Sequence, residues 1–291
     1  MLVHIKEIIE HAQAHNYAVG AFNIHNLESV LGVANAAMKA KSAAIIQVSE
    51  GAIKYMGIKP ITHIVSTVAK NVATNVPIAL HLDHGKDLTN LFECINQGFS
   101  SVHIDASHLP LDENISTTKQ VVELAHSKKV WVQGEVGAII GGHGDTNGTI
   151  KNIPIADPRE VIKFVNETKV DTISAAIGTA HGVYDNEDVK IDLLKKIKAK
   201  TKIPFVLHGG SGVADDIIIN AVKEGVNIIN IGSNIKIAFT DTIKKSCREN
   251  PDETDPRNLL RPTIKAVEDV VIKSMNLFGS AGQSKFKDIE T

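Results

Sequence analysis

The chain has 291 residues, of which 43% are hydrophobic and 22% are charged, and its formal net charge is −2 at pH 7. This length is enough for one large domain with a substantial core, and the near-neutral charge gives no general reason to expect a nucleic acid or an anionic membrane as a partner. The two cysteines, Cys94 and Cys247, form neither a metal motif nor a disulfide framework, so we expect a reducing cytoplasm.

The first fifteen residues combine acidic and histidine side chains with regularly spaced Ile5, Ile8, Ile9 and Ala12. This spacing predicts an amphipathic surface helix and not a signal peptide. No apolar run in the chain approaches the length of a transmembrane segment.

Strand-like and helix-like segments then alternate eight times. The expected strands are 18–24, 43–49, 77–83, 101–106, 130–136, 172–178, 204–208 and 226–232. The expected helices are 27–40, 61–73, 88–97, 113–127, 158–168, 189–198, 214–224 and 235–246. Alternation favours a parallel sheet, because each right-handed crossover covers one of its faces. Eight units in about 230 residues predict a closed (β/α)8 TIM barrel, since a doubly wound open sheet usually has fewer strands and often a glycine-rich first turn.

A polar run at 248–257 ends the barrel, which we place at about 17–247. A helical extension follows at about 256–278, and such an added helix can cap the barrel or reach a neighbouring subunit. We expect residues 1–291 to form a single domain.

The third expected strand ends abruptly in polar residues. Residues 77–85 read P-I-A-L-H-L-D-H-G, an apolar run that stops at Asp83 and His84. A strand buried on both faces that ends in this way directs its carboxyl end into a site. Imidazole is the commonest protein ligand for zinc, and a carboxylate beside it can move protons. We interpret Asp83 as an acid/base and His84 as a metal ligand.

Other strand ends also carry potential ligands, and the carboxyl ends of barrel strands share one face. Histidines from the third, sixth and seventh units, His84, His181 and His208, would give a zinc site with a position open to substrate. Asp105 and Glu135, at the ends of the fourth and fifth strands, would hold a second cation or orient the histidines.

Glycines follow the sixth and seventh strands. Gly182, Gly209 and Gly210 let backbone N–H groups approach an anion, and Ser211 adds a hydroxyl. In barrels a phosphate commonly binds the loops after strands seven and eight. The residues therefore predict a divalent metal, one acid/base carboxylate and at least one phosphate.

The same residues carry a family resemblance. H-L-D-H-G (81–85), I-D-A-S-H (104–108), G-T-A-H-G (178–182) and L-H-G-G-S-G (207–212) together resemble the class II, zinc-dependent ketose-bisphosphate aldolases. The resemblance extends from Y-A-V-G-A-F-N (17–23) to D-P-R (255–257). The stretches 21–28 and 176–182 are slightly more similar to the tagatose-bisphosphate branch than to the fructose branch.

The resemblance implies a role for each residue of the site. His84, His181 and His208 would bind the catalytic zinc, and Asp83 would exchange a proton with the C4 oxygen of the ketose. Asp105 and Glu135 match the position of a second cation. The dihydroxyacetone-phosphate end, often with Na⁺ or K⁺ nearby, would bind Gly182, Gly209, Gly210, Ser211, Asn230, Gly232 and Ser233. Asn23 and Ser49 would touch the sugar backbone, and Arg257 would reach across a homodimer or homotetramer interface to the other phosphate.

The chain also departs from the pattern of this family. The loop that follows the fifth strand reads G-G-H-G-D (141–145), with glycine where a glutamate is expected at 144. In the reaction that the resemblance implies, C3 of the ketose must receive a proton after the bond to C4 breaks, and this loop usually supplies it. Here either His143 or Asp145 supplies that proton, or the step is slow. Gly232 replaces a larger side chain, and Gln133 replaces the usual glutamate two residues before Glu135.

The remaining histidines are interpreted as structural. His81 and His103 alternate with Asp83 and Asp105 along their strands, so we expect them to be hydrogen-bonded core residues or supports of the site. Histidines in helical patterns or loops are interpreted as surface residues: His4, His11, His15, His63, His108 and His126.

Three other functions compete with a zinc aldolase. A Schiff-base aldolase needs a lysine inside the barrel, but Lys86 lies beyond the end of the third strand. A metal-dependent hydrolase would need an early-strand His-x-His pair, which is missing. A non-catalytic paralogue that binds metal and sugar phosphate is supported by the altered loop. Fructose and tagatose bisphosphates and a deoxy-ketogluconate phosphate all remain open as substrates.

Overall fold

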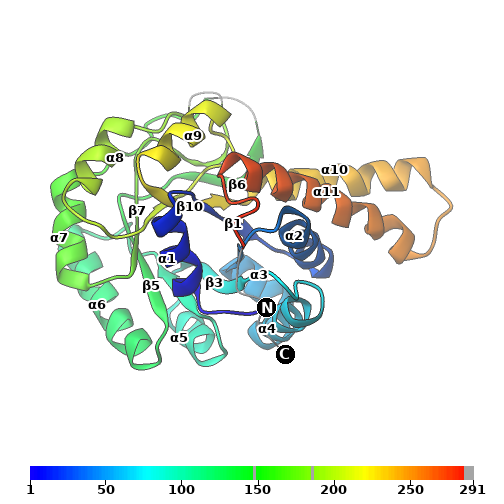
Figure 1. Ribbon diagram of the computed structural model, residues 1–291, viewed down its shortest axis with the longest axis horizontal. Coiled ribbons are helices and arrows are strands. Elements are labelled where there is room, and N and C mark those ends of the chain that lie inside the picture. Colours follow the sequence, from blue (N-terminus) through cyan, green and yellow to red (C-terminus); the bar gives the residue numbers. More distant parts are fainter. Residues whose placement is uncertain (147–148, 185–186, 285–291) are drawn as a thin grey trace.

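The computed structural model describes residues 1–146, 149–184 and 187–284, with the side chains of 142–146 outside that description. Eight parallel strands close into a barrel in the order β1-β10-β9-β7-β5-β4-β3-β2 (Figure 1). Their bounds are β1 Val19–Asn23, β2 Ala44–Ser49, β3 Ile78–Gly85, β4 Ser101–Ile104, β5 Trp131–Val136, β7 Thr172–Ala175, β9 Phe205–Leu207 and β10 Val226–Ile231. The TIM barrel expected from the alternating pattern is confirmed.

Helices surround this barrel and bury their apolar faces against it. They are α2 Leu27–Ala40, α4 Ile58–Asn71, α5 Leu88–Asn96, α6 Leu111–Ser127, α7 Pro158–Thr168, α8 Ile191–Lys198, α9 Asp215–Lys223 and α10 Ser233–Glu249. Several begin at side chains that accept from their first backbone N–H groups, among them Asn26, Asp87 and Asp157. These caps explain why the helix starts lie close to the expected positions.

Helix α1 (Ile5–His15) closes the amino end of the barrel. Its buried residues Ile5, Ile8, Ile9 and Ala12 form a separate apolar cluster with residues at the beginnings of the strands. The predicted amphipathic helix is therefore confirmed, and its apolar face seals the end opposite the candidate site.

Three elements were not expected from the sequence. A short helix, α3 (Glu50–Met56), precedes α4. A two-stranded parallel sheet, β6 (Gly141–Thr146) with β8 (His181–Val183), lies outside the barrel strands and pairs Gly141 with His181. This sheet joins the loop after β5 to the loop after β7.

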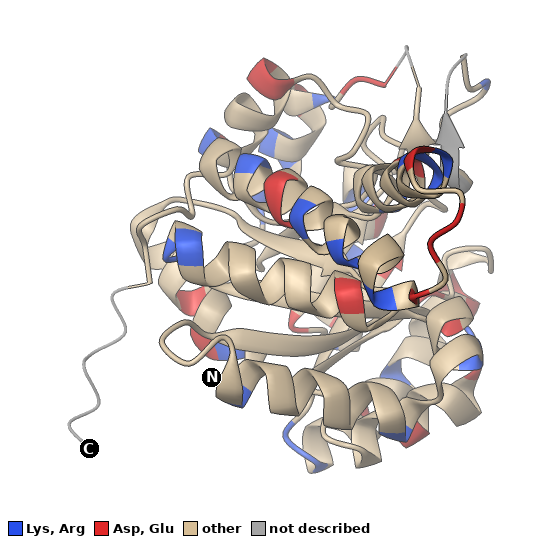
Figure 2. Ribbon diagram, turned by 90° about the vertical axis from the view of Figure 1, so that its right-hand side faces the viewer, with Lys and Arg blue, Asp and Glu red and all other residues tan. Residues whose placement is uncertain are grey.

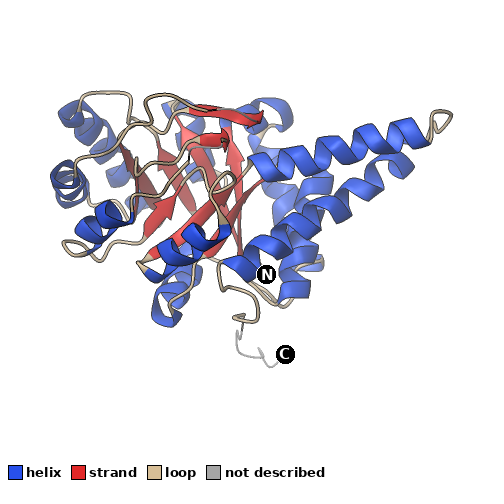
Figure 3. Ribbon diagram, turned by 90° about the horizontal axis from the view of Figure 1, so that it is seen from above, coloured by secondary structure: helices blue, strands red, loops and turns tan. Residues whose placement is uncertain are grey.

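The last two helices form a hairpin that projects from the barrel (Figure 3). Helix α10 runs outward, and α11 (Pro256–Leu277) returns to pack against α2. The packing is close at Gly32, where an added Cβ would lie 2.7 Å from the Val267 side chain. Figure 2, which faces this hairpin, shows Lys and Arg interspersed with Asp and Glu on the helices. Among the helices that the structure describes, none combines the length and apolar character needed to span a membrane.

Candidate active site and metal centre

Polar side chains from several strands meet at the carboxyl end of the barrel. Asp83 and His84 lie at the end of β3, and Glu135 lies near the end of β5. His181 begins β8, and His208 directly follows β9. All are buried except His84, which is partly exposed. Residues far apart in the sequence thus form one cluster at the face where barrel enzymes place their chemistry.

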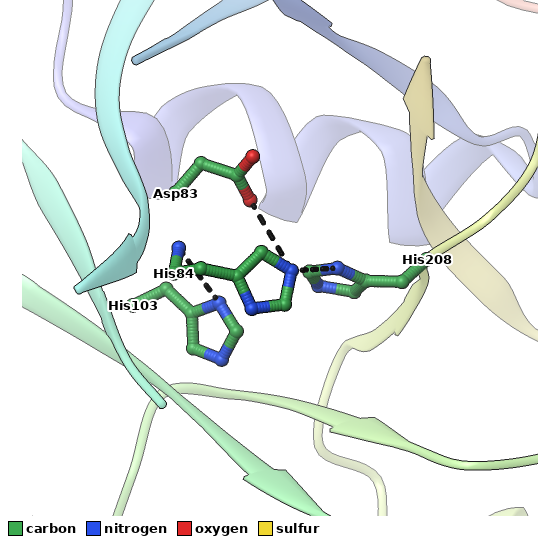
Figure 4. A group of neighbouring side chains, drawn as sticks. All are labelled: Asp83, His84, His103 and His208. Carbon is green, nitrogen blue, oxygen red and sulfur yellow. Dashed lines mark hydrogen bonds and ion pairs between the residues drawn. The ribbon is translucent and has the colours of Figure 1, made fainter. Parts of the chain in front are cut away.

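A local irregularity in β3 turns His84 toward the other histidines. The register between β3 and β4 shifts between Leu82 and Gly85, and His84 has a left-handed backbone with φ of 49°. The His84 backbone N–H donates to His103 Nδ1 at 3.3 Å. Because of this bulge, His84 faces His208 although it directly follows the inward-facing Asp83 (Figure 4).

Two imidazole nitrogens face each other at the centre of the cluster. His84 Nε2 and His208 Nδ1 are 2.9 Å apart, and Asp83 Oδ1 lies 3.9 Å from the same His84 nitrogen (Figure 4). The His181 ring centroid lies 4.7 Å from that of His84 and 5.8 Å from that of His208. The rings of the three histidines expected as zinc ligands are therefore neighbours.

The outer nitrogens of two of these rings are already held by other side chains. His84 Nδ1 is 2.9 Å from Asp105 Oδ2, and His208 Nε2 is 2.7 Å from the Gln133 amide nitrogen. Metal-binding histidines are commonly oriented in this way through the nitrogen that does not face the metal. The described residues whose ligand atoms all lie within 4.8 Å of one another are Asp83, His84, His103 and His208, and this set of donors fits a divalent transition metal. His181 is not part of that group, although its ring is adjacent.

His103 is the fourth histidine of the cluster, and its contacts differ from those of the other three. Its ligand atoms lie close to those of Asp83, His84 and His208. However, His103 Nδ1 accepts from the His84 backbone, so its proton is on Nε2, which points at Glu135 Oε2 at 3.7 Å. Burial lowers the pKa of His103 to about 3, so the ring is neutral. His103 therefore supports its neighbours, as the alternation along β4 suggested.

The charge on His84 follows from its surroundings. Burial opposes protonation, but Asp83, the hydrogen bond with Asp105 and the charge of Glu135 outweigh it and raise the pKa of His84 to about 9. Burial and the neighbouring His84 hold the pKa of His208 well below its usual value. The carboxylates thus favour a positive charge on or next to the His84 ring. A divalent cation bound there would supply that charge and displace the proton from His84.

Asp105 and Glu135 form a second group of carboxylates beside the histidines. Ser107 Oγ lies 2.7 Å from Asp105 Oδ1 and 3.0 Å from Glu135 Oε1, and Ser174 Oγ donates to Glu135 Oε2 at 2.9 Å. Burial raises the pKa of Glu135 to about 7. Lys86 Nζ lies 3.4 Å from Asp105 Oδ2. With His84 these carboxylates form a second group able to hold a cation.

Amide side chains hold the Asp83 carboxylate. Asn23 donates to Asp83 Oδ2 at 2.8 Å, and Gln47 donates to the Asn23 side-chain oxygen at 2.8 Å. Asn230 Nδ2 lies 3.5 Å from Asp83 Oδ1. Asn230 Oδ1 is buried and has no hydrogen-bond partner within the described part of the chain, so it is an acceptor available to a ligand hydroxyl.

A cavity next to Asp83 contains most of the expected substrate-binding residues. Its lining consists of Asn23, Gln47, Asp83, His181, Gly182, His208, Gly209, Ser211, Asn230, Gly232 and Ser233. Gly209 has φ of 71°, and a Cβ there would overlap the Ala180 carbonyl, so only glycine fits this turn. The loops after β9 and β10 thus present their backbone to the same cavity as the candidate acid/base.

Three expected substrate residues lie elsewhere. Gly210 lies behind the loop, where a Cβ would be 2.6 Å from the Ile229 side chain. Ser49 lines a neighbouring cavity. Arg257 is in the first turn of α11, and its 83% exposed side chain makes a two-point contact with Asp255. Within one chain, Arg257 is therefore not part of the cavity.

His143 and Asp145, the two candidate proton donors of the altered loop, are described only by their backbones. The backbones of His143 and Asp145 belong to β6, beside the strand that begins with His181. The side chains of both residues are among those that the structure does not describe.

Sequence reasoning missed several residues that surround the site. Gln47 and Gln133 were not singled out as contacts, although each lies two residues before an expected site residue on the same strand face. Ser107 and Ser174 gave no signal because isolated serines are common on any strand or loop. Lys236 was missed because the helix pattern of α10 gives no indication that its first turn borders a cavity.

Comparison with known proteins agrees with this geometry. The family described as class-II fructose-bisphosphate aldolase matches residues 3–283. A fructose-bisphosphate aldolase of Geobacillus stearothermophilus is 39% identical over 285 residues, which cover 97% of this chain and 99% of that protein. A 6-phospho-5-dehydro-2-deoxy-D-gluconate aldolase of Bacillus subtilis is also 39% identical, over 284 residues and 97% of both chains.

Solved structures show the same similarity. The crystal structure of the YdjI aldolase of Escherichia coli K12 superposes with a TM-score of 0.83 at 28% identity and covers 98% of this chain and 100% of that one. A fructose-bisphosphate aldolase of Campylobacter jejuni gives a TM-score of 0.80 at 26% identity, with 97% of both chains covered.

Proposed function

The chain belongs to the class II fructose-bisphosphate aldolase family, and from this premise we propose that it cleaves a ketose 1,6-bisphosphate reversibly with the help of zinc. The products would be dihydroxyacetone phosphate and glyceraldehyde 3-phosphate. The observation that carries the proposal is the placement of Asp83 between the histidine cluster and a cavity lined by glycine-rich loops.

Asp83 would move the proton of the C4 hydroxyl. Its carboxylate is buried and is held by Asn23, so it is fixed while the substrate binds. A positioned carboxylate of this kind typically contributes a factor of about 10²–10⁴ to the rate. The side-chain oxygen of Asn230, which has no hydrogen-bond partner among the described residues, would accept from a substrate hydroxyl and orient the ketose against Asp83.

His84, His181 and His208 would hold the catalytic ion, with Asp105 and Gln133 fixing two of the rings. When bound, a zinc ion supplies Lewis-acid polarisation of the substrate carbonyl and stabilises the negative charge that develops there. Asp105 and Glu135 would take a second divalent cation, and a Na⁺ or K⁺ ion would accompany the phosphate.

The phosphate next to the ketone would lie on the loops after β8, β9 and β10. Gly182, Gly209 and Ser211 line the cavity together with Gly232 and Ser233, which supports this assignment. Ser49 would contact the distal part of the sugar. His143 or Asp145 would supply the proton that C3 receives after cleavage.

A deoxy-ketogluconate phosphate is the second candidate substrate. The specific observation is that a relative named 6-phospho-5-dehydro-2-deoxy-D-gluconate aldolase is as similar to this chain as a relative named fructose-bisphosphate aldolase. Both reactions break a carbon–carbon bond next to a hydroxyl that a carboxylate such as Asp83 would deprotonate.

The test is a side-by-side cleavage assay of fructose 1,6-bisphosphate, tagatose 1,6-bisphosphate and 6-phospho-5-dehydro-2-deoxygluconate. Each substrate is assayed before chelation, after chelation and after zinc is added back. We expect zinc-restored cleavage, with the highest kcat/KM identifying the substrate. Absence of zinc-dependent cleavage of all three would contradict the proposal and favour a non-catalytic paralogue.

We also propose that residues 1–291 act as one domain in a homodimer or homotetramer and that the protein works in the cytoplasm. The state of the cysteines supports the last point, since Cys94 and Cys247 are both free thiols.

A further inference from the structure

A second cavity of about 370 Å³ adjoins the candidate active site. It lies where β1 and β2 end and where α10 begins, and its lining includes His25, Ser49, Tyr55 and Lys236. Ser49 is paired in register with Asp83 on the neighbouring strand. The cavity therefore begins one strand away from the candidate acid/base, on the side of the barrel formed by β1 and β2.

Lys236 connects this cavity to the catalytic one. It lies in the first turn of α10, three residues after Ser233, which lines the catalytic cavity. Its side chain is half-buried, and its ammonium group is close enough to feel the charge of Asp83. A substrate that is cleaved at Asp83 and anchored on the loop after β9 would extend from the catalytic cavity toward the cavity that Lys236 lines.

The charges of the cavity suit an anion. Lys236 and His25 are basic, and none of the described residues that line the cavity is acidic. Glu50, the residue next to Ser49 in the sequence, uses its carboxylate elsewhere, because this group accepts from the backbone N–H groups of Lys86 at 2.8 Å and Asp87 at 2.6 Å. A dianionic phosphate entering here would meet a cation without facing a lining carboxylate.

Arg257, the residue expected to bind the phosphate at the far end of the substrate, lies away from this cavity within one chain. Within one chain that arginine is highly exposed on the projecting hairpin and is in contact with Asp255. Lys236, in contrast, borders the cavity in every copy of the chain, whatever the oligomeric state.

We propose that Lys236 binds the phosphate at the far end of the substrate and makes the enzyme specific for a phosphorylated aldehyde product. This inference rests on the proposed aldolase function. The lysine would act through a charge-assisted hydrogen bond to the phosphate, and Ser49 would add a hydroxyl donor from the same cavity.

The experiment compares two acceptor aldehydes in the addition reaction. The zinc-loaded full-length protein is given dihydroxyacetone phosphate with glyceraldehyde 3-phosphate, or with glyceraldehyde, which lacks the phosphate. We expect Lys236→Met to lower kcat/KM for the phosphorylated aldehyde by about 10- to 100-fold, the range for loss of a charged hydrogen bond, mainly through KM. The value for glyceraldehyde should change less than about threefold.

Two further variants complete the design. Lys236→Arg keeps the charge and should restore most of the preference for the phosphorylated aldehyde. Lys244→Met removes an exposed lysine two turns further along α10 and should leave both aldehydes unaffected. Unchanged circular dichroism and zinc content would show that the Lys236→Met protein is folded.

The possible outcomes separate the two proposals. Equal losses for both aldehydes would overturn the phosphate role, since they would mean that Lys236 acts through Asp83 or through the fold. Full retention of the preference in Lys236→Met would also overturn it. Failure of the unmodified protein to join dihydroxyacetone phosphate to any of these aldehydes or to cleave any candidate ketose would instead reject the aldolase function itself.

Discussion

The tautomer of His208 depends on one glutamine side chain. Gln133 contacts His208 Nε2 at 2.7 Å, while His208 Nδ1 faces His84. For Nδ1 to offer a lone pair to a metal, Nε2 must carry the proton and donate it to an acceptor. The Gln133 carboxamide can serve as that acceptor with its oxygen turned toward the ring, since its two ends are interchangeable in shape.

We therefore expect Gln133→Leu to weaken zinc binding by about 10- to 100-fold, the usual effect of losing a group that orients a metal ligand. Competition with a chromophoric chelator measures the affinity directly, without an activity assay. Gln133→Glu, which keeps an acceptor at the same place, should bind zinc within a few-fold of the unmodified protein. Gln13→Leu on α1 is a matched surface control. Equal zinc affinity in Gln133→Leu would show that the glutamine does not orient His208.

His81 gives the zinc-free protein a pH-dependent stability. It is buried and bonded to Ser101 Oγ at 2.9 Å, and burial lowers its pKa to about 4. The unfolded chain, with a histidine pKa near 6.5, takes up this proton first as the pH falls. The stability contributed by neutral His81 is therefore present above pH 6.5 and is lost between pH 6.5 and about 4.

Between pH 7 and 4.5 this single group would cost roughly 2 kcal/mol of unfolding free energy. Urea unfolding of the zinc-free protein at several pH values measures the loss. In His81→Asn, which retains a polar contact for Ser101, the loss should be smaller by about that amount. If the variant and the unmodified protein lose stability in parallel, His81 is not the group responsible.

At the level of single residues, the sequence was most informative where chemistry and position coincided. Asp83, His84 and His208 could be predicted because a polar cluster ends an apolar strand, and the structure places them together. Glutamine and serine contacts such as Gln133 and Ser107 could not be predicted, because their role depends on distances across the barrel. Backbone features such as the left-handed His84 are equally invisible in a sequence pattern.

Among the elements, the small sheet of β6 and β8 connects the altered loop to a candidate metal ligand. Gly141 pairs with His181, and the His181 backbone N–H donates to the Ile140 carbonyl at 2.8 Å. Gly141 has φ of 101°, and a Cβ there would overlap the His181 carbonyl oxygen. The glycine thus permits β6 to lie directly against the strand that begins with His181.

Gly141→Ala should therefore displace His181 and lower both zinc affinity and kcat/KM by at least about tenfold, as a misplacement near 1 Å does in other active sites. Gly98→Ala is the matched control, because Gly98 has a similar φ of 94° but its added Cβ would meet nothing closer than 4.0 Å. Both variants carry the backbone strain of about 1–2 kcal/mol that a positive φ imposes on alanine, so Gly98→Ala reports that strain without a steric overlap. Only the first should lose zinc. Equal zinc affinity in both variants would rule out this coupling.

The eight barrel strands and their helices could be predicted because their apolar spacing is strong. The expected α2 and α7 agree with the observed bounds, and most other ends differ by a few residues. The β6 segment, G-G-H-G-D-T, has no apolar alternation, and β8 has only three residues. Such short strands form because neighbouring loops hold them side by side, which a local pattern does not encode.

At the scale of the whole molecule, the α10–α11 hairpin is the feature that the barrel alone does not explain. It extends away from the other helices, and α11 begins at the outer end of the hairpin (Figures 1 and 3). Arg257 is the second residue of α11. This hairpin packs on the rest of the molecule near its base, where α11 contacts α2 and Lys39 forms an ion pair with Glu268 at 2.7 Å. The shape supports the proposal that Arg257 of one chain completes a site in another.

This sharing of sites can be tested by mixing two inactive variants. Asp83→Asn would remove the proposed acid/base of one site, and Arg257→Gln would remove the proposed contact of the arm with the neighbouring site. In a mixed dimer with shared sites, one site would carry both substitutions and the other would be intact. Mixing equal amounts after dissociation and reassembly should then restore about a quarter of full activity, because half of the dimers are mixed and each has one native site.

The control mixture combines Asp83→Asn with His208→Asn. Within any one site these two residues come from the same chain, so every site of the mixed dimer carries one of the substitutions and activity should not be restored. Light scattering of each variant shows whether the oligomer is retained. If the Asp83→Asn and Arg257→Gln mixture has only the average activity of its components, each chain carries a complete site. Lys236, which borders the cavity within one chain, would then be the main cation for the distal phosphate, and the hairpin would serve assembly alone.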